Sequence, residues 1–178
     1  LQKPYFYENM HSMKFANQLV IILLSLFIWV GCKSDPIDLS GKTTVKEKDF
    51  LAAFKPMTLP FSVADTNIDT KADTLVIGKE VFLQFYPDSA FSNIMGKKTI
   101  YTIHPIGLID KEKEKYLLFI IKENKKKKRL VVLVANEKNQ FLASKELLNN
   151  FEGTEYHRSL SINKEPTFLI SREKMGNA

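Results

Sequence analysis

The residues able to do chemistry are few in this chain, and their spacing matches no known catalytic pattern. Histidine is the side chain that titrates near neutral pH and is a common metal ligand, and only His104 and His157 follow the single cysteine. Neither belongs to a His-x-x-His or His-Glu-x-x-His pattern, and the chain has no Gly-x-Ser-x-Gly elbow or glycine-rich phosphate loop. We therefore interpret both histidines as ordinary strand residues, and we expect no catalytic residue, no metal and no cofactor.

One acidic segment imitates the opening of a calcium loop. Asp65, Asn67 and Asp69 alternate as oxygen ligands do in such loops. The sixth position, however, is Thr70 instead of Gly, and the twelfth is Val76 instead of a bidentate Glu. The segment is therefore predicted to be a polar turn.

A run of five basic residues is the most conspicuous local feature: Lys125, Lys126, Lys127, Lys128 and Arg129. It falls at a predicted hairpin tip between two apolar strands. One hypothesis is contact with phosphates of lipopolysaccharide or of a bilayer, worth about 1 kcal/mol per basic residue. The alternative, which the sequence alone favours, is a solvated turn whose like charges discourage aggregation. The net charge of +6 is too small to indicate a nucleic-acid partner.

The only cysteine, Cys32, follows an apolar run and excludes an intrachain disulfide. The run, Leu19 to Val30, contains one polar residue, Ser25, and is preceded by Met13 and Lys14. At about 1.5 Å per residue in a helix, it is too short to cross a hydrocarbon core of roughly 30 Å. A short basic start, an apolar run and a small residue before the cut are typical of a cleaved export signal.

The four residues Trp29-Val30-Gly31-Cys32 resemble the lipobox of bacterial lipoproteins. The resemblance implies cleavage after Gly31, transfer of diacylglycerol to the Cys32 sulfur, and fatty acylation, for example by palmitate, of the new amino group. Two or three acyl chains give stable membrane anchoring where one is marginal. The resemblance also implies the outer membrane of a Gram-negative bacterium, facing the periplasm or the exterior.

The chain divides into four segments by composition. Residues 1–12 precede Met13 and are predicted to be an upstream extension, and residues 13–31 are predicted to be the signal peptide. Residues 32–44 are polar and predict a flexible tether. Residues 45–178 are predicted to form a single β-rich domain, because 44% hydrophobic residues suffice for one core.

The first part of this domain predicts short elements. Thr44 and Glu47 have the spacing of a capping box, which predicts a helix over residues 45–54. Residues 74–77 predict a strand, and residues 80–86 are compatible with a short helix or a strand.

The second part predicts an antiparallel meander. Polar turns separate short segments rich in β-branched and aromatic residues. The continuous apolar stretches 117–121 and 130–134 predict central strands covered on both faces. The expected fold is mainly β, an open sheet, a sandwich or a partial barrel, with a propeller-like arrangement as a less favoured alternative. The predicted strands are 98–109, 115–122, 129–136, 140–147, 156–162 and 166–172.

These features together favour a non-enzymatic binding or structural module of the cell envelope, similar to small Gram-negative lipoproteins. The membrane is the expected partner through the lipid, with an envelope protein, anionic lipid or lipopolysaccharide as a second partner. One alternative is a glycan or peptide hydrolase using carboxylates such as Asp88 or Glu155, which must lie roughly 5–10 Å apart. Another is a carrier of a hydrophobic ligand, which requires an apolar cavity of about 300–1,000 Å³.

Overall fold

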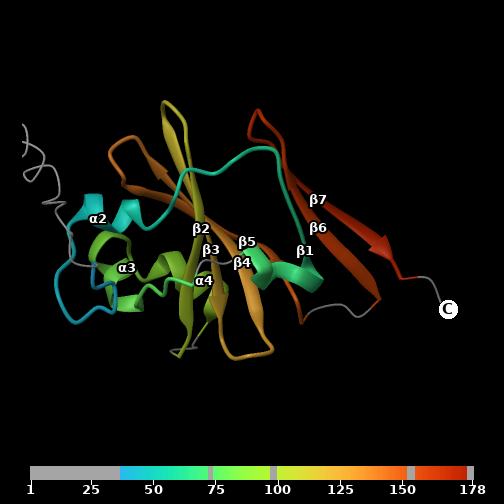
Figure 1. The fold of residues 1–178 in the computed structure, drawn as a ribbon, viewed down its shortest axis with the longest axis horizontal. Helices are drawn as coiled ribbons and strands as arrows, with labels where there is room; N and C mark the ends of the chain where they lie inside the picture. Colours follow the sequence, from blue (N-terminus) through green and yellow to red (C-terminus); the bar gives the residue numbers. More distant parts are fainter. Residues whose placement is uncertain (1–36, 72–73, 97–99, 152–154, 176–178) are drawn as a thin grey trace, which may run out of the picture. The chain divides into compact units, whose positions relative to one another are not determined.

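Strands dominate the computed structural model, which describes residues 37–71, 74–96, 100–151 and 155–175 (Figure 1). Seven strands, three short α-helices and one 3-10 helix occur in these ranges. The mainly β fold is therefore confirmed, with more helix than the one short N-terminal element expected. The elements are α2 Glu47–Ala52, β1 Phe61–Ala64, η1 Asp65–Lys71 (3-10), α3 Lys79–Phe85, α4 Ser89–Met95, β2 Thr102–Asp110, β3 Glu114–Lys122, β4 Lys128–Asn136, β5 Phe141–Asn149, β6 Tyr156–Ile162 and β7 Phe168–Lys174.

The strands form two open antiparallel sheets. Strands β2, β3, β4 and β5 pair in chain order, as expected for a meander built from successive hairpins. The second sheet has the order β1-β6-β7, so a strand from the N-terminal part of the domain pairs with the C-terminal hairpin. The prediction of an open sheet is confirmed, and neither sheet closes into a barrel.

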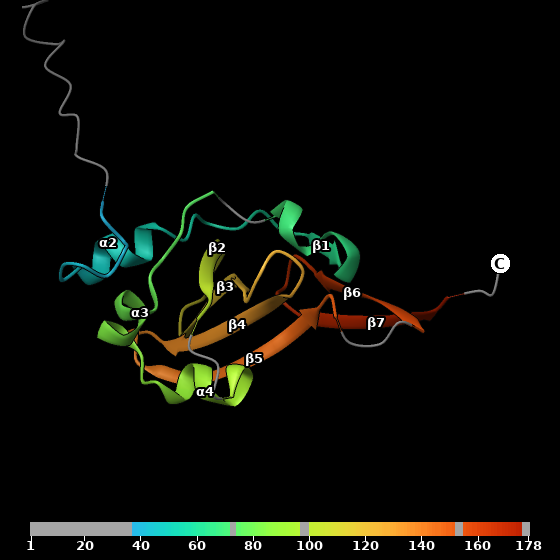
Figure 2. The same cartoon turned by 90° about the horizontal axis from the view of Figure 1, so that it is seen from below.

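Aromatic side chains fill the core between the helices and one face of the meander. Alternate residues of the central strands, such as Leu117 and Phe119 on β3, point to this side and are fully buried. Phe50 from α2, Phe82 from α3 and Phe91 from α4 contribute rings to this cluster, which also contains aliphatic side chains. Figure 2 shows α3 and α4 on the side of the meander away from β1, β6 and β7.

Aliphatic side chains form a second core on the opposite face of the meander. Leu118 and Leu130 point to this side and pack with Val63 of β1, Ile68 of η1 and Leu160 of β6, all at most 3% exposed. The three-stranded sheet therefore lies over the meander. The prediction that the two apolar stretches are central strands covered on both faces is confirmed.

The segment before α2 is held against α3. Leu39 is buried, and its carbonyl oxygen accepts a hydrogen bond of 2.7 Å from the amide of Gly78. Gly41 has a φ of +93°, and a Cβ there would lie 2.8 Å from the Cβ of Glu80. Residues 37–44, whose polar composition predicts a tether, are therefore part of the packed unit that begins at Ile37.

The predicted capping box at the start of α2 is wrong. The helix begins at Glu47, and its N-cap is Lys46, which makes no side-chain capping bond. The reason lies one residue earlier, because Val45 is buried and its amide donates a 2.9 Å hydrogen bond to Oε1 of Gln84. This contact keeps the chain extended before the helix, so Thr44 lies two positions before the N-cap.

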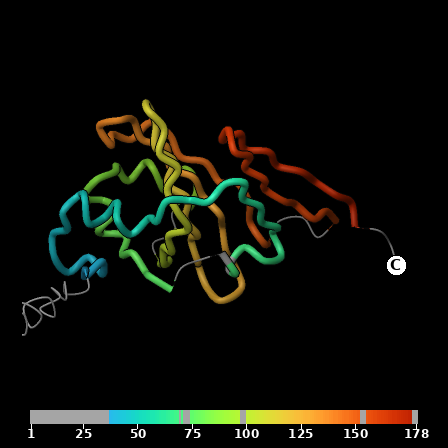
Figure 3. Tube along the Cα trace, turned by 45° about the horizontal axis from the view of Figure 1, so that its top comes forward, coloured from blue at the N-terminus to red at the C-terminus, as the bar shows by residue number. Residues whose placement is uncertain are grey.

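The segment after α2 crosses the meander beside β2 before it enters the second sheet, and its path can be traced in Figure 3. The amide of Met57 donates to the Leu108 carbonyl at 2.9 Å, and the Leu108 amide donates to the Lys55 carbonyl at 2.9 Å. Gly107 permits this approach, because a Cβ at that position would lie 2.3 Å from Cγ of Met57. The crossing covers part of the outer edge of β2 and leads the chain to β1.

Candidate anionic-surface interface

Lys125, Lys126 and Lys127 occupy the turn between β3 and β4, as predicted for the basic run, and Lys128 and Arg129 begin β4. Hydrogen bonds close this turn. The amide of Glu123 donates to the Lys127 carbonyl at 3.0 Å. Oδ1 of Asn124 accepts hydrogen bonds from the amides of Lys126 and Lys127, both at 2.8 Å. Asparagine side chains favour such turns because they replace a backbone acceptor. We call residues 123–128 the lysine turn.

A second asparagine fixes the lysine turn to the end of β5. Asn150 accepts a hydrogen bond from the Lys128 amide through Oδ1 and donates one from Nδ2 to the Lys126 carbonyl, each 2.8 Å long. The Asn150 amide also donates to the Lys128 carbonyl at 3.2 Å. The backbone that carries the lysines is therefore bonded on both sides, to Asn124 within the turn and to Asn150 outside it.

The lysines of this turn differ in their surroundings. Lys125 and Lys126 are exposed, and Nζ of Lys127 lies 5.4 Å from the centroid of the Phe151 ring. Lys128 is half-buried at the start of β4. The turn thus presents three exposed lysines, one of which, Lys127, also lies over an aromatic ring.

Arg129, the last residue of the basic run, points into the protein instead. Its side chain is only 11% exposed, its Nε lies 2.7 Å from Oε1 of Glu123, and its Nη1 donates to Glu146. Burial alone would lower the pKa of Arg129, but hydrogen bonds to Glu123 and Glu146 outweigh it and raise that pKa above its usual value. The structure therefore separates Arg129 from the lysines and uses it as a buried cation.

Polar contacts continue from Arg129 to the second sheet. Glu146 accepts a hydrogen bond from Nδ2 of Asn149. Nη2 of Arg158 on β6 donates to both oxygens of Asn149, at 2.9 Å to the carbonyl and 2.8 Å to Oδ1. The Arg158 amide in turn donates to Oδ2 of Asp65 at 2.8 Å. The sequence alone did not reveal this connection, because its members are spread over more than half of the described chain.

The segment 65–69, predicted to be a polar turn, lies in the 3-10 helix η1 and begins with the buried carboxylate of Asp65. Asp65 is buried, and its Oδ1 accepts no hydrogen bond from the described residues but lies 3.7 Å from Nδ1 of His157. Oδ1 of Asn67 accepts the Ala64 amide at 3.0 Å, and the backbone of Asn67 forms a non-helical kink within η1. Within the described residues, no three histidine, cysteine or acidic side chains gather as metal ligands.

Each of the remaining polar candidates has its own separate contacts. His104 is buried on β2, with Nε2 3.1 Å from the hydroxyl of Thr102. His157 is half-exposed at the start of β6. Asp88 precedes α4 and lies 3.2 Å from Nζ of Lys79. Glu155 precedes β6, where its carbonyl accepts the amide of Met175.

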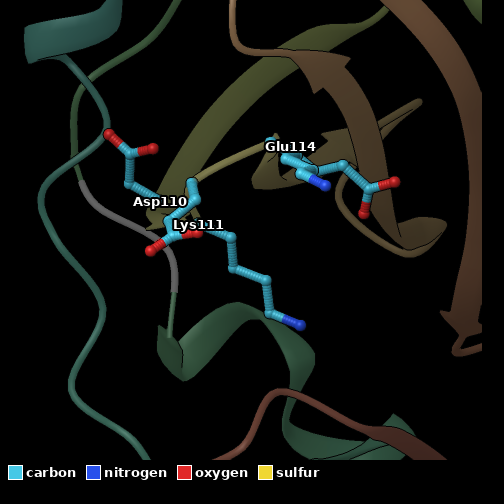
Figure 4. A pocket seen from close by; sticks show the side chains of 5 residues that line it. Asp110, Lys111 and Glu114 are labelled. Carbon is cyan, nitrogen blue, oxygen red and sulfur yellow. The ribbon is translucent and has the colours of Figure 1, made fainter.

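A hollow of about 630 Å³ lies at the turn between β2 and β3. Its lining is a single run of charged residues, Asp110 to Glu114. Figure 4 shows the side chains of Lys111 and Glu114 pointing in different directions. The hollow therefore lacks both the apolar lining that a lipid carrier requires and a set of converging groups.

Gly31 and Cys32, the predicted cleavage and lipidation residues, lie outside the described residues. In the described part of the chain, every helix is too short or too polar to cross a membrane.

Comparison with known proteins gives no further constraint on function. No family model matches the chain, and no curated protein or solved structure matches it. Function is therefore argued from the residues themselves.

Proposed function

We propose that this chain is a lipid-anchored, non-enzymatic binding module of the Gram-negative envelope, and that its lysine turn contacts anionic groups at a membrane surface. The observation that carries the proposal is the ordered display of charge. Lys125 and Lys126 are exposed on a turn whose backbone is bonded to Asn124 and Asn150. A fixed turn loses less conformational entropy on binding than a mobile one.

Two acidic side chains beside the basic run are engaged by Arg129. Glu123 and Glu146 both hydrogen bond to Arg129. Lys125 and Lys126 are exposed at the tip, so their positive charges face solvent. At about 1 kcal/mol for each basic residue near an anionic surface, two or three lysines give a weak contact on their own.

The proposed lipid at Cys32 supplies the missing affinity. An acylated chain holds the domain near one membrane, so the lysine turn meets phosphates at a high effective concentration. Under this proposal the lipid anchors the chain to the membrane. The lysine turn then orients the domain on that membrane or binds an anionic ligand there.

Lipidation is tested directly by replacing Cys32. We expect Cys32→Ser to abolish labelling by a fatty-acid probe and to release the chain from membranes. Labelling that persists in this variant would contradict the lipoprotein assignment.

The lysine turn is tested with the lipid removed, so that weak contacts are measurable. In a Cys32→Ser background, the full chain is sedimented with vesicles of phosphatidylglycerol or of phosphatidylcholine. The test variant carries Lys125→Glu and Lys126→Glu. The matched control carries Lys113→Glu and Lys138→Glu, which change the net charge equally at exposed sites in the other two turns of the meander.

We expect the parent chain to bind the anionic vesicles and to lose this binding with added salt. The Lys125/Lys126 variant should bind at least about tenfold more weakly, as roughly 1.4 kcal/mol corresponds to tenfold. The control variant should lose clearly less. Equal losses in both variants would show that net charge, and not the turn, governs binding.

A further inference from the structure

Among the four outer edges of the two sheets, that of β7 is the most open. Residues near Pro56 and Ile77 pair with the outer edge of β2. On β5, the hydroxyl of Ser144 donates to the Ala90 carbonyl of α4. β1 is a strand of only four residues that runs directly into η1. β7 spans seven residues, pairs only with β6 among the described strands, and is the outermost strand in Figure 1.

The side chains of β7 extend beyond the aliphatic core. Leu160 on β6 is fully buried, whereas its register partner Ile170 on β7 is 38% exposed and Leu169 is 61% exposed. The strand contains neither proline nor glycine. A strand of this kind offers a row of backbone donors and acceptors to another strand.

The two halves of β7 differ in chemistry. In an antiparallel pair of two such strands, the apolar half of each strand lies opposite the charged half of the other. Residues 168–170 are apolar and residues 172–174 are charged, with Ser171 between them. When two such strands run antiparallel with Ser171 opposite Ser171, all seven residues are paired. Every charged residue then lies opposite an uncharged one.

We propose that β7 pairs with β7 of a second copy of this chain, in the antiparallel register centred on Ser171. In this register Leu169 lies opposite Glu173 of the other copy, and Ile170 lies opposite Arg172. The aliphatic stem of Arg172 covers the exposed part of Ile170. A register centred on Arg172 would instead place two arginines opposite each other. The two three-stranded sheets join into one sheet of six strands.

Cysteine cross-linking tests the register in the full chain. In a Cys32→Ser background, Ser171→Cys places two thiols directly opposite each other, at a Cα separation of about 4.5–5.5 Å, which a disulfide can span. The matched control is Ser161→Cys, an exposed serine on the neighbouring strand β6. We expect mild oxidation to give a disulfide dimer with Ser171→Cys at least about tenfold faster than with Ser161→Cys. Equal rates would overturn the proposal.

Sedimentation of the chain without introduced cysteines tests the pairing itself. Leu169→Glu, at an exposed position, places two like charges opposite each other at each end of the register. It should convert dimers to monomers, and adding Glu173→Lys to it should restore the dimer because opposite charges then face each other. A parent chain that stays monomeric at all concentrations, or a dimer that ignores both substitutions, would overturn the proposal.

Discussion

The two faces of the meander are covered in different ways. On one face, rings from three short helices pack edge to face, as between Phe82 and Phe91, whose centroids are 5.2 Å apart at 88°. On the other face, a sheet rests on leucine, isoleucine and valine, and phenylalanines lie only at its border. The first cover depends on ring packing, whereas the second depends on strand pairing.

This difference indicates how each cover is stabilised. Helices of six or seven residues are unstable alone in water, so α2, α3 and α4 require their buried rings. The three-stranded sheet has its own hydrogen-bonded ladder, and its outer strand β7 contributes little to the core. Single substitutions in the core of the helical face should therefore lower the free energy of unfolding strongly. In the three-stranded sheet, the same kind of substitution should cost less on β7 than on β6.

The largest expected effect is on the helical face. Phe82 is fully buried and lies within 5.2 Å, between centroids, of Phe50, Phe91 and Phe119. Phe82→Ala should lower the free energy of unfolding by about 4 kcal/mol, measured by chemical denaturation. The neighbouring Leu83→Ala, at a residue 39% exposed, is the control and should cost about 1 kcal/mol or less. Similar losses in both would contradict the importance of ring packing.

The second prediction compares the stability cost of truncating a side chain on β6 with that on β7, the outer strand of the three-stranded sheet. Leu160→Ala should cost about 3 kcal/mol, because the side chain is fully buried in the aliphatic core. Ile170→Ala, at the register partner on β7, should cost about 1 kcal/mol or less at concentrations where the chain is monomeric. Thermal and chemical unfolding of the pair measure this difference. An equal cost at both positions would show that β7 belongs to the core.

The third prediction is a pH dependence that arises at Tyr86 on the helical face. Burial, aided by the charge of Glu47, raises the pKa of Tyr86 from 10.0 to about 12. The neutral phenol is therefore favoured in the folded state, so stability present below pH 10 is lost as the pH rises toward 12. Two pH units correspond to a loss of about 2–3 kcal/mol.

The control for this prediction is a tyrosine at the surface. Tyr86→Phe should lose less stability than the parent over this pH range, whereas Tyr156→Phe, at a residue 42% exposed, should follow the parent. Denaturation below pH 10 and near pH 12 gives the comparison. Equal losses of stability in the parent and both variants would show that a group other than Tyr86 causes the loss at alkaline pH.

The smallest expected effect is in the lysine turn. Asn124→Ala removes the acceptor of two backbone amides and should cost about 1 kcal/mol. We expect amide hydrogen exchange at Lys126 and Lys127 to accelerate, with little change in the two cores. Unchanged exchange at these amides would show that Asn124 does not order the turn.

The sequence predicted the meander well because strand signals are local. The segment 156–162 matches β6 at both ends, and 115–122 matches β3 within one residue. The apolar stretches in β3 and β4 also indicated two covered faces. Helix α4 was not predicted, because Ala90, Phe91 and Met95 are buried on one face of a helix too short to show clear periodicity.

The site was predicted only in part, since side-chain direction depends on the tertiary structure. The sequence placed the basic run at a hairpin tip, but nothing in five consecutive cations distinguishes Arg129 from the lysines. Its inward direction depends on Glu146, which arrives from β5. Likewise, Thr44 and Glu47 have capping-box spacing, and only the distant Gln84 explains why no such cap forms.

The pairing of β1 with β6 has a consequence for how the chain folds during synthesis. Phe61 pairs with Ile162, about 100 positions later in the sequence. The meander can assemble from neighbouring hairpins, but β1 can pair only after about 100 further residues have been made. Until then the sheet that covers the aliphatic face of the meander is incomplete, and exposed apolar surface at this stage favours aggregation.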